Sequence, residues 1–278
     1  MIIRCWGARG SIPVSGKEYL KYGGDTSCIE IRTGDEIVII DAGTGIRRLG
    51  NRLIEEKRFE YTMIFTHAHW DHILGFPFFR PIYLNRTRIN MIGCPFAQES
   101  IRQIVSKTMT FPNFPVKFDE VSASISYHES CMERFSVGAM EVIPIVLSHP
   151  NQSIGYKFIE DGKSFVYMTD NELSFKHEGG LDYGSYLDFV RDADLLIHDS
   201  EYTEEEYGMR RTWGHSRYKD ALGLALDAEA KRFGLFHHNQ ERTDAQIDEM
   251  VNSCRQIIEE KKSELHCFGV YQDMEIIL

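Results

Sequence analysis

Four potential metal ligands fall within six consecutive residues of this chain, and no other feature constrains its structure as strongly. They lie in the sequence THAHWDH at residues 66–72 and are His67, His69, Asp71 and His72. The apolar run from Tyr61 to Phe65 precedes them and indicates a strand that ends at the cluster. Side chains two positions apart share one face of an extended segment but point about 200° apart on a helix. A loop at a strand end is therefore the conformation that fits the cluster best.

This spacing predicts two adjacent metal sites. On an extended segment His67 and His69 take one cation, while Asp71 and His72 turn to the other side and take a second. Imidazole combined with carboxylate is the ligand set of zinc, manganese or iron, and no Cys pair lies nearby for a closed structural zinc site. We therefore expect two divalent cations, with zinc preferred. A polar loop with chance histidines is disfavoured, because the whole chain has only 11 histidines.

The pattern H-x-H-x-D-H resembles the metallo-β-lactamase superfamily. That resemblance implies three further single ligands later in the chain, each at the end of a strand. Three apolar runs end at suitable residues: 142–147 before His149, 165–168 before Asp170 and 231–236 before His237. The resemblance implies one metal held by His67, His69 and His149, a second held by Asp71, His72 and His237, and Asp170 as the bridge. His238 is the alternative to His237, which we prefer because it follows the strand directly.

A second segment of the sequence indicates one branch of this superfamily. Residues 195–225 carry an acidic residue after a strand, followed by Gly-His-Ser at 214–216 opening an Ala-rich helix. This pattern is similar to the phosphodiesterase branch that includes ribonuclease Z. The resemblance implies that Asp199 and His215 form a carboxylate–imidazole pair beside the metals, with His215 protonating the leaving oxygen or binding a phosphate oxygen. In the alternative reading, His215 or Ser216 only caps the helix.

Further segments extend the similarity over nearly the full length: WGARGSIPVSG, YGGDTSCIEI, DAGTGIRRLG and FHHNQERTD. Together they resemble bacterial phosphodiester hydrolases related to ribonuclease Z and to cyclic phosphodiesterases. The fold that this implies is a four-layer αββα sandwich, two mixed β-sheets flanked by helices. Periodicity alone shows a mixed α/β chain, with strands at 2–6, 28–32 and 36–40, a Gly-rich turn at 41–45 leading into a helix at 46–56, and a C-terminal helix capped by Thr243.

Composition indicates one compact domain over residues 1–278. The chain is 42% hydrophobic and has no Pro/Gly/Ser-rich linker. It contains no run of 18 apolar residues and no signal-peptide pattern, so we expect a cytoplasmic protein that does not enter membranes. The net charge of −11 opposes broad attachment to nucleic acid or anionic lipid. The six scattered cysteines are expected to be buried thiols: Cys5, Cys28, Cys94, Cys131, Cys254 and Cys267.

These features predict a dinuclear metal-dependent hydrolase of a small or cyclic phosphodiester. The catalytic residues are expected to be Asp71, Asp170, Asp199 and His215. The alternatives are a ribonuclease Z-like RNA endonuclease, a thioester or lactam hydrolase, and a non-enzymatic module that retains its metals. A homodimer is an alternative to a monomer. Two weaker expectations are open: Arg9 either reaches an anionic substrate or lies hydrated at the surface, and the aromatic residues at 76–79 and 111–118 either line a base-stacking pocket or belong to the core.

Overall fold

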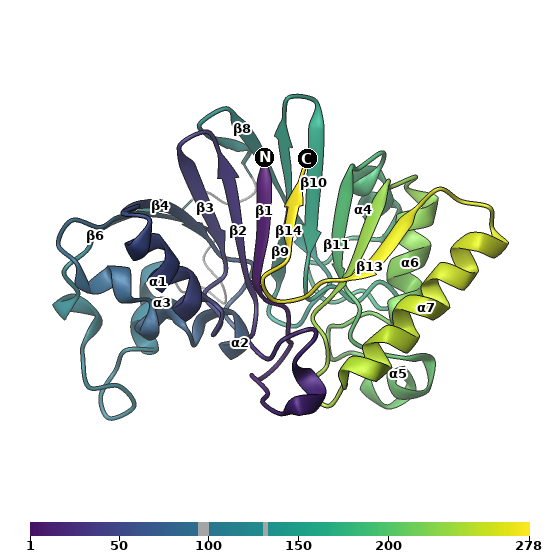
Figure 1. Ribbon diagram of the computed structural model, residues 1–278, viewed down its shortest axis with the longest axis horizontal. Coiled ribbons are helices and arrows are strands. Elements are labelled where there is room, and N and C mark those ends of the chain that lie inside the picture. The colour runs from purple at the N-terminus through teal and green to yellow at the C-terminus, as the bar shows by residue number, and fades with distance from the viewer. Residues whose placement is uncertain (94–99, 130–132) are drawn as a thin grey trace.

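Two β-sheets packed face to face form the centre of the computed structural model, which describes residues 1–93, 100–129 and 133–278 (Figure 1). Each sheet has seven strands within these residues. The first has the order β14-β1-β2-β3-β4-β5-β6, with β1 Ile2–Gly7, β2 Cys28–Thr33, β3 Glu36–Ile40, β4 Glu60–Ile64, β5 Arg88–Gly93, β6 Ser124–Glu129 and β14 Glu275–Ile277. The second has the order β13-β12-β11-β10-β9-β8-β7, with β7 Phe135–Val137, β8 Met140–Leu147, β9 Ser153–Glu160, β10 Lys163–Met168, β11 Leu195–Asp199, β12 Arg232–Phe236 and β13 His266–Gly269.

Both sheets mix parallel and antiparallel pairs. In the first sheet β3 to β6 pair in parallel, whereas β14, β1, β2 and β3 pair antiparallel. In the second sheet β10 to β13 pair in parallel, whereas β7 to β10 pair antiparallel. Parallel strands present their carboxyl ends at a common edge, which is where the cluster of histidines lies.

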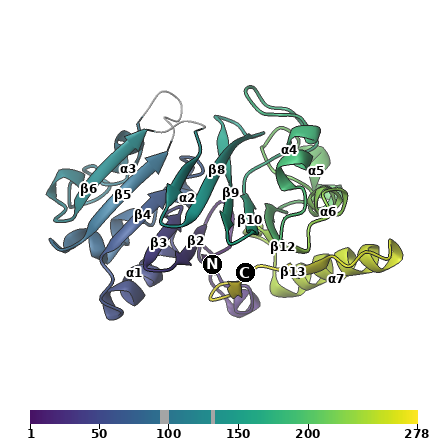
Figure 2. The same ribbon diagram turned by 90° about the horizontal axis from the view of Figure 1, so that it is seen from above.

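Helices cover the outer faces of the sandwich (Figures 1 and 2). Their bounds are α1 Ile46–Glu55, α2 Trp70–Ile73, α3 Ile101–Lys107, α4 Tyr183–Val190, α5 Glu204–Arg210, α6 Tyr218–Asp227 and α7 Asp244–Glu260. Helices α1 and α3 lie on the side of the first sheet, and α4, α6 and α7 lie on the side of the second. The predicted αββα sandwich of two mixed sheets is therefore confirmed.

The second sheet is buried on both faces, and its sequence shows why. Along β10, Phe165 and Tyr167 join the core between the two sheets, whereas Val166 and Met168 join the core beneath the outer helices. Successive side chains of a strand point to opposite faces. A strand covered on both sides must therefore be apolar throughout, as the run before Asp170 is.

The elements predicted from periodicity are confirmed, with ends that differ by no more than one residue. Strands β1, β2 and β3 occupy the predicted segments, and the 41–45 turn leads into α1. Thr243 caps α7 by accepting a hydrogen bond from the backbone of Gln246, and the Gln246 side chain closes the capping box. The buried residues of α7 form one stripe: Ile247, Met250, Val251, Cys254 and Ile258.

Two further expectations can be compared with the structure. Within the described ranges, no helix is long and apolar enough to cross a membrane. Four of the cysteines are free and buried, as expected: Cys5, Cys28, Cys254 and Cys267. Cys94 and Cys131 lie outside the described residues.

Candidate metal centre

The predicted ligands come together where strands from both sheets end. His67 and His69 follow β4 of the first sheet, and the three later residues follow strands β8, β10 and β12 of the second sheet: His149, Asp170 and His237. Asp170 and His237 have φ angles of 55° and 58°. This left-handed conformation costs about 1 kcal/mol or more for a residue with a side chain. It turns the chain sharply just after the strand and presents the side chain at the sheet edge.

The metal-binding segment is not a loop throughout, which corrects one expectation. His69 has an extended backbone, but Asp71 and His72 lie in the one-turn helix α2. The shared face expected from an extended segment therefore holds only for His67 and His69. Successive residues of a helix point about 100° apart. In the helical turn, Asp71 and His72 therefore point in different directions from His67 and His69 and reach a second group of ligands.

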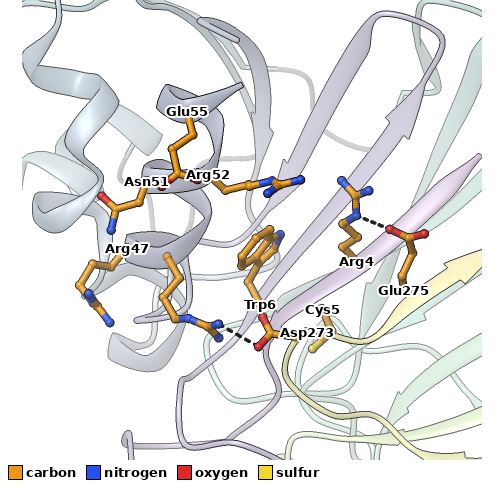
Figure 3. A pocket seen from close by; sticks show the side chains of 10 residues that line it. Arg4, Cys5, Trp6, Arg47, Asn51, Arg52, Glu55, Asp273 and Glu275 are labelled. Carbon is orange, nitrogen blue, oxygen red and sulfur yellow. Dashed lines mark hydrogen bonds and ion pairs between the residues drawn. The ribbon is translucent and has the colours of Figure 1, made fainter. Parts of the chain in front are cut away.

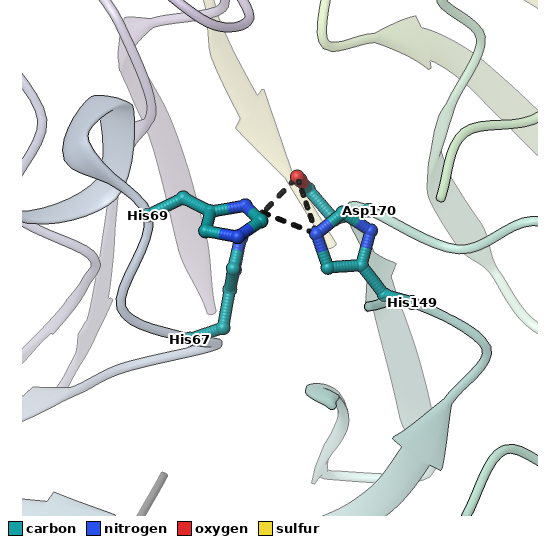
Figure 4. Close-up of side chains that lie close together, drawn as sticks. All are labelled: His67, His69, His149 and Asp170. Carbon is teal, nitrogen blue, oxygen red and sulfur yellow. Dashed lines mark hydrogen bonds and ion pairs between the residues drawn. The ribbon is translucent and has the colours of Figure 1, made fainter. Parts of the chain in front are cut away.

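The first group consists of His67, His69, His149 and Asp170 (Figure 4). Each offers one ligand atom, and these atoms all lie within 4.8 Å of one another. Nε2 of His67 lies 3.3 Å and Nε2 of His149 lies 3.7 Å from Oδ2 of Asp170. Nδ1 of His69 lies 3.1 Å from Nε2 of His149. Three imidazole nitrogens and one carboxylate oxygen thus surround a single point.

The second group consists of Asp71, His72 and His237. Oδ2 of Asp71 lies 3.3 Å from Nε2 of His72 and 3.0 Å from Nε2 of His237. Oδ1 of Asp170 lies 3.3 Å and 3.4 Å from the same two nitrogens. Asp170 therefore turns one oxygen toward each group, which is the arrangement expected of a bridging carboxylate.

Two buried nitrogens supply a test of whether this cluster fits metal ions. Nε2 of His67 and Nε2 of His72 are buried and make no hydrogen bond of acceptable geometry to any described residue, although each has a carboxylate oxygen at 3.3 Å. Buried polar atoms in proteins are nearly always paired. A cation in each group would give both nitrogens a partner, so the donor set fits divalent cations.

The imidazoles are oriented by acceptors behind them. Nδ1 of His72 donates to Asp41 at 2.8 Å, Nδ1 of His149 donates to the Gly214 carbonyl at 2.9 Å, and Nδ1 of His237 donates to Glu201 at 2.9 Å. Each of these bonds fixes the ring and leaves Nε2 directed at the cluster.

Sequence reasoning missed these three supporting groups. Asp41 directly follows β3 and is the first residue of the DAGTG turn, and Glu201 lies two residues after Asp199 at the end of β11. An acidic residue one or two positions after a strand was the signal that could have identified both. Gly214 acts through its backbone carbonyl, for which the sequence carries no side-chain signal.

The histidines of the cluster are of two kinds, which differ in the direction in which their pKa is shifted. Burial lowers the pKa of His67 and His149, and burial together with neighbouring imidazoles lowers the pKa of His69 to about 4. These three rings are neutral and offer lone pairs near neutral pH.

The second group behaves in the opposite way. Burial works against protonation of His72 and His237, but the surrounding carboxylates outweigh it and raise the pKa of both rings. Burial would likewise raise the pKa of Asp71 and Asp170, but the adjacent histidines hold it well below its usual range. Ionised carboxylates that draw positive charge into a buried cluster fit a cation site.

His215 lies beside the second group. Its Nδ1 donates to Oδ2 of Asp199 at 2.8 Å, and its ring stacks on His237 with centroids 4.7 Å apart. Burial lowers the pKa of His215, but Glu201 and Asp199 more than offset this and raise it to about 9. The ring therefore carries a proton at neutral pH.

The helix-cap reading of this segment is wrong. The N-cap of α6 is Arg217, and its side chain makes no capping hydrogen bond to the first turn of the helix. Ser216 instead donates from Oγ to the Asn171 carbonyl at 2.5 Å and accepts from the backbone N–H of Leu173 at 3.1 Å. Ser216 thus ties the His215 segment to the loop after Asp170.

The two adjacent histidines point in different directions. His237 points into the second group, whereas Nε2 of His238 donates to the carbonyl of Val270 at 2.7 Å. The His238 ring packs edge-on against Tyr22, with centroids 5.3 Å apart. The geometry therefore places His237 at the cluster and His238 behind it.

Arg9 fits neither of its expected roles. Its side chain is fully buried, Nε donates to the carbonyl of Gly23 at 2.8 Å and Nη1 donates to the carbonyl of Arg242 at 2.6 Å. Arg9 therefore joins two loops behind the site. Among the aromatic residues, Phe76 and Phe79 belong to the core, whereas Phe78 and Phe111 are exposed.

A cavity of about 590 Å³ lies between α1 and the β1–β14 pair (Figure 3). None of the cluster residues lines it. Arg4 is paired with Glu275 at 2.6 Å and Arg48 with Asp273 at 2.8 Å. These ion pairs neutralise part of its positive charge, and the cavity is separate from the chemistry described above.

Comparison with known proteins agrees with this fold. Residues 36–238 match the family model described as "Beta-lactamase superfamily domain". The ribonuclease Z of Haloarcula marismortui is 25% identical over 293 residues, covering 90% of this chain and 89% of the relative. The metallo-β-lactamase fold protein YhfI from Bacillus subtilis superposes with a TM-score of 0.72 at 16% identity, covering 99% and 98% of the two chains. A structure described as a new diphosphatase from the PhnP family gives a TM-score of 0.69 at 17% identity, covering 100% of this chain and 97% of the other.

Proposed function

Because the chain belongs to the β-lactamase superfamily, we propose that it is a phosphodiester hydrolase that works with two divalent cations. Zinc is the preferred metal, since imidazole and carboxylate ligands suit it, and manganese or iron are alternatives. One cation would be held by the first group and the other by the second, and Asp170 would contribute one oxygen to each. The seven proposed ligands are His67, His69, Asp71, His72, His149, Asp170 and His237.

The chemistry that two such cations supply is a water of lowered pKa and neutralisation of charge on the phosphate oxygens. The residues of the chain hold the components of this reaction in place. Asp170 spans both groups through its two oxygens. Asp71 is fixed by the backbone N–H of Ser11, which donates to its Oδ2 at 2.8 Å. Neither carboxylate needs to move during the reaction, so the site is preorganised.

The observation that carries the proposal is the pair formed by His215 and Asp199. A buried, protonated imidazole lies next to the second group and is oriented by a carboxylate at 2.8 Å. Phosphodiester hydrolysis expels an alkoxide, which needs a proton. A thiolate leaves without one, so a thioesterase has little use for this pair. In this proposal His215 holds the proton for the leaving oxygen, and Asp199 keeps its ring in position.

A ribonuclease Z-like activity is the second candidate, favoured by the name of the relative with 25% identity. The net charge of −11 opposes it, because RNA binding relies on basic surfaces that neutralise phosphates. A small or cyclic phosphodiester is therefore the preferred substrate.

A substrate panel separates these candidates. The protein is stripped of metal and reconstituted with zinc, manganese, iron or magnesium. It is then assayed on bis-p-nitrophenyl phosphate, cyclic mononucleotides, 2′,3′-cyclic phosphates and precursor transfer RNA, and on nitrocefin and S-lactoylglutathione as substrates without phosphorus. Hydrolysis of small diesters supports the main proposal, and cleavage of the RNA alone supports the second. Activity restricted to nitrocefin or S-lactoylglutathione contradicts both. Retention of two metals with no hydrolysis of any substrate would indicate a binding module.

A further inference from the structure

A second cavity, of about 510 Å³, lies between α2 and α3. Its apolar wall includes Trp70, Leu74 and Ile104, and its polar rim is formed by Lys107, Thr108 and Asn113. The volume lies in the range of small-molecule sites, which combine apolar walls with a few polar groups. The cavity therefore has the size and composition of a ligand site.

Two residues that line the cavity alternate in the sequence with proposed metal ligands. Ala68, which also lines it, lies between His67 and His69 in the sequence, and Trp70 lies between His69 and Asp71. Consecutive Cα atoms are about 3.8 Å apart, so the indole begins one residue from two proposed ligands. The cavity wall and the cluster are therefore built in part on the same short stretch of chain, residues 67–72.

Part of the apolar wall is open to solvent. The side chains of Trp70 and Leu74 are 76% and 42% exposed, although both are large and apolar. An exposed indole at the edge of a charged site is a stacking surface, because every nucleobase has a π-face that an aromatic ring can cover. The amide of Asn113 and the hydroxyl of Thr108 supply donors and acceptors for the edge of a base.

We propose that this cavity binds the nucleobase of a nucleotide phosphodiester, with Trp70 as the stacking surface and α3 as the opposite wall. The proposal rests on the proposed function and names its substrate class. It also replaces Phe76 and Phe79 as expected base-stacking aromatics, since both are fully buried. Specificity for a base is then decided by α2 and α3, whereas the chemistry is decided by the cluster.

Two esters with the same leaving group test this proposal. Thymidine 5′-(p-nitrophenyl) phosphate carries a base, methyl p-nitrophenyl phosphate does not, and both release the same phenolate. In Trp70→Ala we expect KM for the thymidine ester to rise about 10-fold, because stacking of one base on one aromatic ring has about that effect. We expect kcat, KM for the methyl ester and bound metal to be unchanged.

Trp70 lies within the metal-binding segment 66–72, so its substitution could also disturb the metal ligands. A variant outside that segment controls for this effect. Thr108→Trp fills the cavity from the side of α3 and should raise KM for the thymidine ester in the same way. Tyr271→Ala, which removes an exposed aromatic that does not line the cavity, should change neither ester. Equal losses on both esters, or no loss in either cavity variant, would overturn the proposal.

Binding measurements test the base-binding proposal separately from the proposed phosphodiesterase activity. If the native protein hydrolyses neither ester, the proposed function fails, and quenching of Trp fluorescence by thymidine 5′-monophosphate still tests the cavity. Quenching that disappears in Trp70→Ala supports the base site, and quenching that persists in that variant contradicts it. A change from dimer to monomer in Trp70→Ala, measured by light scattering, would show instead that the cavity is an interface between two copies and would overturn it.

Discussion

Oε2 of Glu201 lies 2.9 Å from Nδ1 of His237 and 3.4 Å from Nδ1 of His215. One buried carboxylate therefore contacts a proposed metal ligand and the proposed acid at once. Its other oxygen accepts a hydrogen bond from Nδ2 of Asn239 at 2.8 Å. Glu201 thus couples the orientation of the second group to the charge on His215.

Replacing Glu201 by Gln should weaken metal binding in the second group. Both oxygens of the carboxylate accept hydrogen bonds, whereas an amide offers one oxygen, so either His237 or Asn239 loses its acceptor. Loss of such support usually costs about 10- to 100-fold in metal affinity. Competition titration with a chelator measures it. Glu205→Gln, an exposed position on α5, is the control and should retain native affinity.

Gly10→Ala should displace His237 and lower occupancy of the second group. A Cβ at position 10 would lie 2.3 Å from Nδ1 of His237, closer than van der Waals contact allows. Elemental analysis should find about one metal per chain rather than two. Gly223→Ala is the matched control, because nothing lies within 4 Å of its added Cβ. Alanine favours a helix over glycine by about 1 kcal/mol, so that variant should be as stable as the native protein or more so. Two metals retained in Gly10→Ala would contradict the placement of His237.

Asp170→Ala should abolish activity and reduce metal in both groups. Its two oxygens face one group each, so the substitution removes a ligand from both. His67→Ala should also abolish activity, but its loss of metal should begin with the first group. Metal content and turnover are measured on the same samples. Full activity with two metals in either variant would rule out the dinuclear site.

His215→Ala should lower turnover of a diester with an alkoxide leaving group by about 10²- to 10⁴-fold, the usual range for general acid catalysis. Metal content should not change. An ester of p-nitrophenol should lose much less, since this leaving group departs without a proton. Asp199→Asn should follow the same pattern more weakly, because Asp199 orients the ring. Equal losses on both leaving groups would instead assign His215 to binding a phosphate oxygen.

Arg9→Met should destabilise the fold by about 3 kcal/mol without removing a ligand. The guanidinium is fully buried and donates to the carbonyls of Gly23 and Arg242, which would lose their partners. Hydrogen bonds from charged groups each contribute about 1.5–3 kcal/mol. Urea unfolding measures the change. A variant as stable as the native protein would show that the two loops do not depend on Arg9.

Much of the fold and of the cluster could be predicted from the sequence, because the relevant signals are local. The resemblance to the metallo-β-lactamase superfamily implied single ligands at strand ends, and His149, Asp170 and His237 each lie within two residues of the end of a strand. Strand and helix periodicity likewise placed β1, β2, β3 and α7. These patterns depend on neighbours in the sequence, so one chain suffices to find them.

Only the tertiary structure decided how distant segments meet. Asp41 and Glu201 acquire their roles by lying behind His72 and His237, which are 31 and 36 residues away in sequence. The direction of His238, the burial of Arg9 and the cavity at Trp70 also depend on contacts between separate elements. Side-chain type and spacing determine which atoms can bind a metal. Which of them converge, and what holds each ring at its angle, is set by the packing of two sheets whose strand ends share one edge.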